Sequence, residues 1–203
     1  MWRSVLIAGF VGLVGALSAT SVNASALLIG NPAFAAEGET TTIPVGAYQF
    51  CASHRAECGP DTPAAAHVDL TEALWSQMIA VNDSINTTVA PETDQDLYGK
   101  EEFWAYPTTA GDCEDYVLAK RRSLIADGMP ASALLIAVVR RTDGEGHAVL
   151  MVRTDRGDLV LDNLTGSIVT WDRTPYQYIK RQSELNAGLW VSIKDSRTLV
   201  AGR

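Results

Sequence analysis

The hydrophobic pattern of the chain changes its period near the middle. In residues 70–89, apolar side chains recur at intervals of three or four, which is the spacing of one face of an α-helix. These positions are Leu74, Met78, Val81 and Ile85. Asp69 precedes them and is a favourable N-cap residue, so we predict a helix over residues 70–89.

A second helical pattern follows a polar loop. Residues 116–126 are mostly good helix formers, with apolar positions seven apart that fall on one face. Asp112 is suited to cap the start, with Asp115 three positions on, and Gly128 marks the end. The predicted helix therefore has Cys113 in its first turn.

Short, continuous apolar runs replace the helical spacing in the second half of the chain. The predicted strands cover residues 134–139, 147–152, 159–162, 165–170 and 189–193. Turn-forming residues join the first three, so an antiparallel meander is the simplest topology. Helices followed by an antiparallel sheet predict a single α+β domain over residues 37–203, in which residues 37–66 form an extended lead-in.

The N-terminal segment differs from this domain. Arg3 is followed by an apolar stretch over residues 5–17 that is too short to span a membrane comfortably. Two tripeptides, Ala24-Ser25-Ala26 and Ala33-Phe34-Ala35, fit a cleavage pattern with small residues. We therefore expect residues 1–26 to be a secretory signal peptide, with residue 35 as the latest cleavage point and an uncleaved anchor as the alternative.

The charge balance narrows the class of protein. Twenty-four acidic and 16 basic residues give a formal net charge of −8, and the basic residues do not cluster. Such a chain is poorly suited to bind nucleic acid or anionic lipid. Together with the signal peptide, the composition predicts a soluble, exported protein in an oxidising compartment.

The three cysteines fall into two groups. Cys51 and Cys58 are seven positions apart, which favours a disulfide in an exported protein. The alternative is a metal site that also uses His54, although it offers only three ligands. Cys113 stands alone, so it is either reactive or paired between chains.

Cys113 is the candidate nucleophile, because a thiol at a helix N-terminus lies at the positive end of the helix dipole. A cysteine nucleophile needs a base and a group that orients the base. Of the three histidines, His54 falls in the disulfide loop and His67 precedes the first helix. His147 begins a predicted strand after a turn and is our choice for the base.

Asp162 is the candidate orienting group. A turn of two or four residues before its strand would pair it with Val149 or Met151, on the same face as His147. A three-residue turn would place Asp162 on the opposite face. A carboxylate at the end of an apolar strand also needs a partner, because burial without one is unfavourable.

Three motifs resemble the bacterial transglutaminase-like cysteine proteinases. They are Gly-Asp-Cys-Glu-Asp-Tyr at 111–116, Gly-His-Ala-Val-Leu at 146–150 and Leu-Asp-Asn at 161–163. The Phe-Cys pair at 50–51, Cys58 and the Phe-Trp pair at 103–104 are also similar. The resemblance implies a papain-like, transglutaminase-like fold and a catalytic triad of Cys113, His147 and Asp162.

The resemblance also implies calcium beside the nucleophile. The matching acidic residues are Asp112 and Glu114, with Asp115 as a weaker candidate. Oxygen ligands suit calcium. Without a metal, acidic residues in a first turn still interact favourably with the helix dipole, but they oppose thiolate formation. A bound cation would offset that opposition.

The family resemblance implies a calcium-dependent periplasmic endopeptidase. Its substrate would be a large outer-membrane adhesin, and an inner-membrane receptor would sequester the protease. The backbone N–H of Cys113 is a natural oxyanion donor, and the indole N–H of Trp104 is the candidate for the second. Protein-glutamine acyl transfer and calcium-dependent binding without catalysis remain as alternatives.

Overall fold

A computed structural model describes residues 33–60, 67–195 and 197, so the signal peptide predicted at residues 1–26 lies outside the described residues. Within them, seven strands form one antiparallel sheet in the order β1-β9-β8-β4-β5-β6-β7. The strands are β1 (Glu37–Thr41), β4 (Leu134–Arg140), β5 (Gly146–Thr154), β6 (Gly157–Leu161), β7 (Val169–Thr170), β8 (Gln177–Ser183) and β9 (Asn186–Ile193). The short strands β2 (Ala90–Pro91) and β3 (Ala110–Gly111) pair in parallel.

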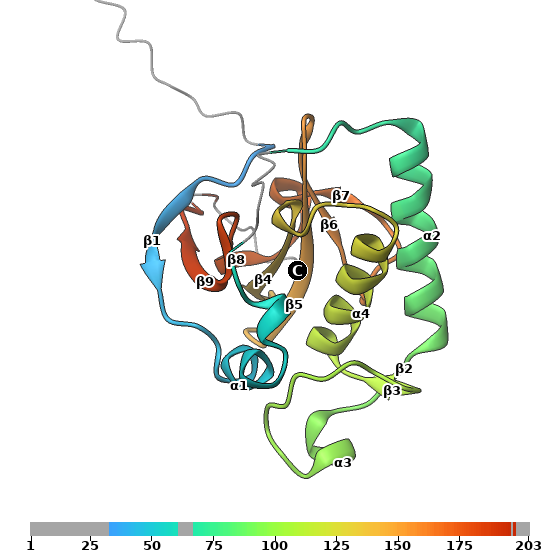
Figure 1. Cartoon of the computed structure of the whole chain (residues 1–203), viewed down its shortest axis with the longest axis vertical. Coiled ribbons are helices and arrows are strands. Elements are labelled where there is room, and N and C mark those ends of the chain that lie inside the picture. Colours follow the sequence, from blue (N-terminus) through green and yellow to red (C-terminus); the bar gives the residue numbers. More distant parts are fainter. Residues whose placement is uncertain (1–32, 61–66, 196, 198–203) are drawn as a thin grey trace, which may run out of the picture.

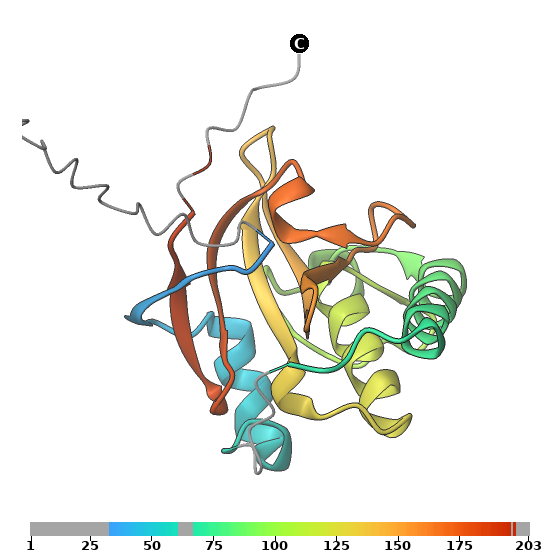
Figure 2. The same ribbon diagram turned by 90° about the horizontal axis from the view of Figure 1, so that it is seen from above.

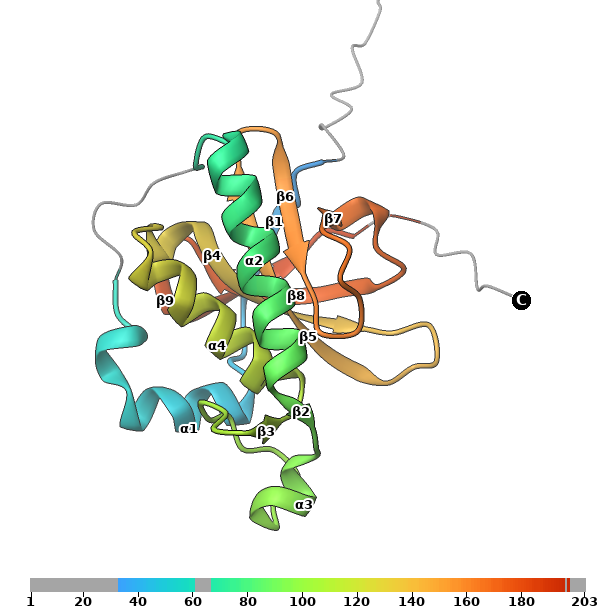
Figure 3. The same cartoon turned by 90° about the vertical axis from the view of Figure 1, so that its right-hand side faces the viewer.

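Among the described residues, three helices cover one face of the sheet: α1 (Val45–Ser53), α2 (Glu72–Thr88) and α4 (Cys113–Ala126). The short helix α3 (Asp94–Tyr98) lies beyond the end of the sheet, and the 3₁₀ turns are η1 (Arg55–Glu57), η2 (Ala131–Ala133) and η3 (Trp171–Arg173). Figure 1 shows α4 between the sheet and α2, and the turned view in Figure 3 agrees. Helix α4 packs directly on β5, and the Ala148 backbone N–H contacts the Cys113 thiol, so the two elements begin close together. No helix in the described ranges is both long enough and apolar enough to cross a bilayer.

The predicted meander is present as β4-β5-β6-β7, although β7 covers only Val169–Thr170 of the strand predicted at 165–170, and the predicted last strand is part of β9. Strand β8, which inserts between β4 and β9, was missed. Its sequence has no apolar run because two of its buried positions are Arg181 and Gln182. Arg181 Nη2 forms ion pairs with Glu37 and Glu184, and the Gln182 side chain hydrogen bonds to backbone groups.

Two predictions about the helices were wrong in detail. The first long helix begins at Glu72 and is capped by Thr71, whose hydroxyl accepts a hydrogen bond from the Leu74 N–H, and Asp69 does not cap it. The lead-in predicted as extended contains α1, which the sequence hides because it is short and includes Gly46. That glycine is required by packing, because a Cβ there would lie 2.2 Å from the Trp104 ring.

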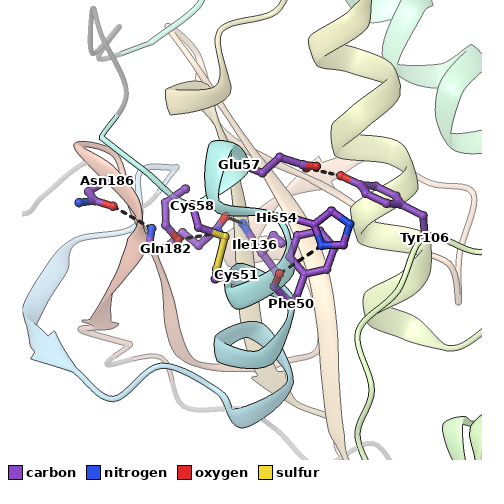
Figure 4. The surroundings of a disulfide bond; sticks show 11 residues. Phe50, Cys51, His54, Glu57, Cys58, Tyr106, Ile136, Gln182 and Asn186 are labelled. Atoms are coloured by element: carbon purple, nitrogen blue, oxygen red, sulfur yellow. Dashed lines mark hydrogen bonds between the residues drawn. A yellow bond between two sulfur atoms is a disulfide. The ribbon is translucent and has the colours of Figure 1, made fainter.

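The Cys51–Cys58 pair forms a disulfide between α1 and the turn that follows it (Figure 4). The metal site considered for these cysteines is not formed, since both sulfur atoms are in the bond. His54 instead uses Nδ1 to hydrogen bond the Phe50 carbonyl and stacks on the Phe50 ring. The segment is also tied to the site region, because the Tyr106 hydroxyl donates to Glu57.

Both faces of the sheet are buried. The face under α4 and α2 carries a large apolar cluster that includes Leu134, Ile136, Leu150 and Trp190. The opposite face carries a second cluster built from Val149, Met151, Val160, Trp171, Tyr176 and Tyr178. Figure 2 shows from above how the chain between β7 and β8, which carries Trp171 and Tyr176, turns back into the sheet at β8. Central strands buried on both faces explain the continuous apolar runs in the sequence.

Lys120 is an exception in the core beneath α4. It is fully buried, and its ammonium has no hydrogen-bond partner among the described residues. Burial lowers the pKa of Lys120 from its usual 10.5 to about 7, with Asp162 opposing the shift. A buried ammonium without a hydrogen-bond partner destabilises the native state. An apolar side chain of similar volume does not have this effect.

We therefore expect Lys120→Met to stabilise the protein at pH 7 by about 1–4 kcal/mol. Between pH 7 and 10.5 the unfolded chain holds a proton on Lys120 that the folded chain does not, so native stability rises with pH in this window. The variant should lack that rise. Urea unfolding at pH 7 and pH 9.5 measures both effects, and an equal pH dependence in the two proteins would contradict the assignment.

Candidate active site

A cleft of about 880 Å³ opens at the end of the sheet where β5 begins. Cys113 and His147 both line it, together with Trp104 and Ala148. Acidic side chains from the α3 region and the start of α4 form another part of its wall. The cleft therefore brings a thiol, an imidazole and a group of carboxylates to one place.

Helix α4 begins at Cys113, as predicted. Asp112 occupies the N-cap position, but its side chain makes no capping hydrogen bond, so the predicted cap is absent. The preceding Gly111 pairs with Pro91, and a Cβ on Gly111 would lie 2.6 Å from Asp115 Oδ2. A glycine is therefore needed before the helix, because the Asp115 side chain folds back over it.

His147 and Asp162 are in direct contact. His147 Nε2 lies 2.9 Å from Asp162 Oδ1, and both side chains are buried. Thr154 pairs with Gly157, so the turn between β5 and β6 has two residues, and extending the register by one position sets Asp162 opposite Val149. With Nε2 occupied by the carboxylate, Nδ1 is the ring nitrogen left to exchange a proton with a thiol.

The Asp162 carboxylate is held as an anion. Burial alone would raise the pKa of Asp162, but hydrogen bonds from His147, the Leu164 N–H and the Tyr176 hydroxyl outweigh burial and lower the pKa below its usual value. Asn86 donates from α2 to the backbone carbonyl of the same residue. Asp162 is therefore both charged and fixed in place.

The Cys113 thiol does not follow the expectation from the helix dipole. Burial and the adjacent Glu114 carboxylate raise the pKa of Cys113 well above its usual value, while the Ala148 backbone N–H opposes the rise. The thiol donates to Glu114 Oε2 over 3.2 Å. Desolvation and a neighbouring negative charge outweigh the dipole at this helix start.

Three carboxylates meet beside Cys113. One oxygen each from Asp94, Asp112 and Glu114 lies within 4.8 Å of the other two. Burial raises the pKa of Asp94, with the Asp112 carboxylate adding to the rise. Burial and Asp112 also raise the pKa of Glu114 well above its usual value. Mutual repulsion of this kind is expected where carboxylates converge without a cation.

The β2–β3 pairing explains how Asp94 reaches this cluster. Pro91 lies opposite Gly111, so Asp94 and Glu114 each lie three residues beyond a paired position. Sequence reasoning missed Asp94 because it is one of several acids in a polar loop. A two-residue parallel pairing leaves no recognisable pattern in the sequence.

Two other predicted site residues have different surroundings. Asp115 is not part of the carboxylate group, and its Oδ1 accepts a hydrogen bond from the Ala105 N–H over 2.8 Å. The Trp104 indole N–H donates to Glu102 Oε1 over 2.8 Å, so it is already engaged. Asp115 and Trp104 thus shape the loop before Cys113.

The donor set of the carboxylate group fits a hard divalent cation. Asp94 Oδ1 and Asp112 Oδ1 are buried and have no hydrogen-bond partner among the described residues. Buried carboxylate oxygens without partners are unfavourable unless a cation or water completes them. All three ligands offer oxygen, which is the preference of calcium.

The chain is similar to a known protein family and to solved structures. A model of the family described as bacterial transglutaminase-like cysteine proteinase BTLCP matches residues 37–198. The chain is 27% identical to calcium-bound LapG of Legionella pneumophila, with a TM-score of 0.50 over 63% of this chain and 75% of that chain. A search of curated proteins gave no match.

Two further structures of Legionella pneumophila LapG are similar. One is 29% identical, with a TM-score of 0.50 over 58% of this chain and 68% of that chain. The other, treated with EGTA, is 28% identical, with a TM-score of 0.50 over 61% and 72%. The similarity confirms the α+β, transglutaminase-like fold predicted from the sequence.

Proposed function

The chain belongs to the bacterial transglutaminase-like cysteine proteinase family, and on that basis we propose that it is a calcium-dependent endopeptidase with a Cys113-His147-Asp162 triad. The observation that carries the proposal is the buried His147–Asp162 hydrogen bond at the wall of a cleft that Cys113 also lines. A nucleophile, a base and an orienting acid are the parts that covalent acyl chemistry requires.

In this mechanism His147 Nδ1 accepts the thiol proton, and Cys113 Sγ attacks the carbonyl carbon of the scissile peptide bond. The carbon–nitrogen bond breaks, and His147 returns the proton to the leaving amine. His147 then removes a proton from water, which attacks the thioester and releases the acid product and the free thiol. The Cys113 N–H, at the start of α4, donates to the oxyanion.

Calcium would be held by Asp94, Asp112 and Glu114. When bound, it supplies positive charge next to the nucleophile. Glu114 links the proposed calcium site to the nucleophile, because its carboxylate contacts the Cys113 sulfur. The calcium-bound and EGTA-treated states of LapG support the same ion for this chain.

The proposed substrate is a protein exposed in the periplasm, such as the periplasmic part of a large outer-membrane adhesin, and an inner-membrane receptor is the proposed partner that sequesters the enzyme. Export by a signal peptide cleaved near Ala26 fits the described N-terminal residues. Ala35 N–H donates to Asp158 Oδ2 over 2.7 Å, and Asp158 N–H donates to the Ala33 carbonyl. Cleavage after residue 35 would remove both bonds, so the mass of the exported chain tests the site.

Hydrolysis and acyl transfer use the same triad but differ in the acceptor. We expect the purified protein to cleave a protein substrate in the presence of calcium and to incorporate little labelled primary amine into a glutamine peptide. Mass spectrometry of the products separates the two reactions. Amine incorporation without new peptide termini would replace the protease assignment by a transglutaminase.

A binding module without catalysis is the remaining alternative. It predicts no selective labelling of Cys113 by a thiol-reactive probe, with or without calcium. Cys113 is the free cysteine, because Cys51 and Cys58 are joined in the disulfide. One calcium-dependent label per chain is therefore the expected result for the enzyme.

A further inference from the structure

The Asp162 carboxylate is held from both of its oxygens. Oδ1 accepts hydrogen bonds from His147 Nε2 at 2.9 Å and from the Leu164 N–H at 3.0 Å. Oδ2 accepts one from the Tyr176 hydroxyl at 2.5 Å. With both oxygens engaged, rotation of the carboxylate would break a bond on each side.

Tyr176 also touches the base. Its ring meets the His147 ring edge to face, with ring centroids 5.4 Å apart and an interplanar angle of 65°. The Tyr176 side chain is buried, and it lies outside the set of described residues that line the cleft around Cys113. One side chain therefore contacts both partners of the His147–Asp162 pair without reaching the nucleophile.

Arg197, near the end of the described chain, holds the backbone at Tyr176 in place. Arg197 Nη2 donates to the Tyr176 carbonyl over 2.7 Å, and Nη1 donates to the Trp171 carbonyl over 3.1 Å. Its guanidinium also stacks on the Trp171 ring and pairs with Asp195. The segment between η3 and β8 is thus held rigidly behind Asp162.

We propose that Tyr176 is a positioning residue for the reaction: it fixes the Asp162 carboxylate so that Oδ1 stays directed at His147 Nε2. The inference rests on the proposed function, because it assigns Tyr176 a part in orienting the triad base. It is independent of the calcium site. A hydrogen bond to a charged group in a buried site is among the stronger ones, so its loss is expected to matter.

The test is Tyr176→Phe, which removes the hydroxyl and keeps the ring against His147. We expect kcat for peptide cleavage to fall about tenfold with KM nearly unchanged, because orientation of the base affects the chemical step. Tyr178→Phe is the matched control. Tyr178 is a buried tyrosine two residues further on, in β8, and its hydroxyl accepts a hydrogen bond from Thr174 Oγ1 at 3.3 Å instead of donating to Asp162.

A second measurement needs no substrate. Proton NMR of the calcium-loaded protein should show a far-downfield Nε2–H resonance of His147, retained in Tyr178→Phe and moved upfield or broadened in Tyr176→Phe. If that resonance and kcat are the same in both variants, Tyr176 has no positioning role. If the wild-type protein has no peptidase activity but the resonance responds to Tyr176→Phe, the positioning holds and the proposed function fails.

Discussion

Replacing Cys113 by alanine is expected to lower peptide-bond cleavage by at least about a thousandfold, to the background of the assay. The sulfur is the atom that forms the acyl intermediate, and neither His147 nor Asp162 can substitute for it. The loss should appear in kcat with any cleavable protein or peptide, and product analysis by mass spectrometry measures it. Ser123→Ala, on the same helix but away from the cleft, is the control.

The fold of the Cys113→Ala protein should remain intact, because Cys113 is only partly buried and its removal leaves the packing of α4 on β5 in place. Circular dichroism and thermal unfolding check this. The variant should also keep its response to calcium, since Asp94, Asp112 and Glu114 are unchanged. Full proteolytic activity in a correctly folded Cys113→Ala protein would refute the nucleophile assignment.

Removing calcium with a chelator is expected to lower the thermal midpoint by about 5–10 °C relative to protein at a hundredfold excess of calcium over its Kd. Ligand at that excess stabilises the native state by about 2.7 kcal/mol, and each kcal/mol is worth about 2–4 °C in a chain of this size. The physical source is relief of repulsion among three converging carboxylates. Differential scanning calorimetry with and without calcium measures the shift.

Chelation should also slow alkylation of Cys113 at neutral pH by about tenfold or more. Burial and the Glu114 carboxylate raise the pKa of the thiol, so little thiolate forms without a cation to offset the negative charge. The rate is measured by quenching the alkylation at set times and determining the mass of the intact protein. Equal alkylation rates with calcium and with chelator would mean that the ion does not affect the reactivity of Cys113 and has only a structural role.

Two isosteric variants locate the ion. Asp94→Asn removes a charge from the carboxylate group and should abolish both calcium effects. Asp115→Asn is the control, because an amide oxygen can still accept the Ala105 N–H and Asp115 lies outside the group. Loss of the calcium response in Asp115→Asn with its retention in Asp94→Asn would favour the ligand set implied by sequence resemblance over the one in the structure.

The elements that could be predicted from the sequence are those in which apolar residues recur at a regular spacing or form a continuous run. Helix α4 and strands β4, β5 and β6 are read directly from apolar spacing, and both faces of the central strands are buried as continuous runs require. Strand β8 could not be predicted, because its buried positions include Arg181 and Gln182, whose burial depends on partners elsewhere in the chain. Helix α1 escapes because it is short and is stabilised by packing and by the disulfide.

The candidate site divides in the same way. Cys113, His147 and Asp162 could be joined by helix position and strand register, which are local properties once the turn length is known. Asp94 and Tyr176 could not, because each reaches the site through a contact between distant segments. Asp115 was included for its place beside Cys113, yet in a helical turn neighbouring side chains point in different directions.

In the hairpin of β5 and β6, the number of residues in the turn should be conserved during evolution more strictly than their identity. Surface loops usually tolerate insertions during evolution. Here one residue added at Arg156 and carried into β6 would turn Asp162 to the opposite face of the sheet, whereas two added residues would restore its side. Lineages of this family should therefore vary the length of the β4–β5 connection, which does not separate His147 from Asp162, more freely than that of the β5–β6 turn.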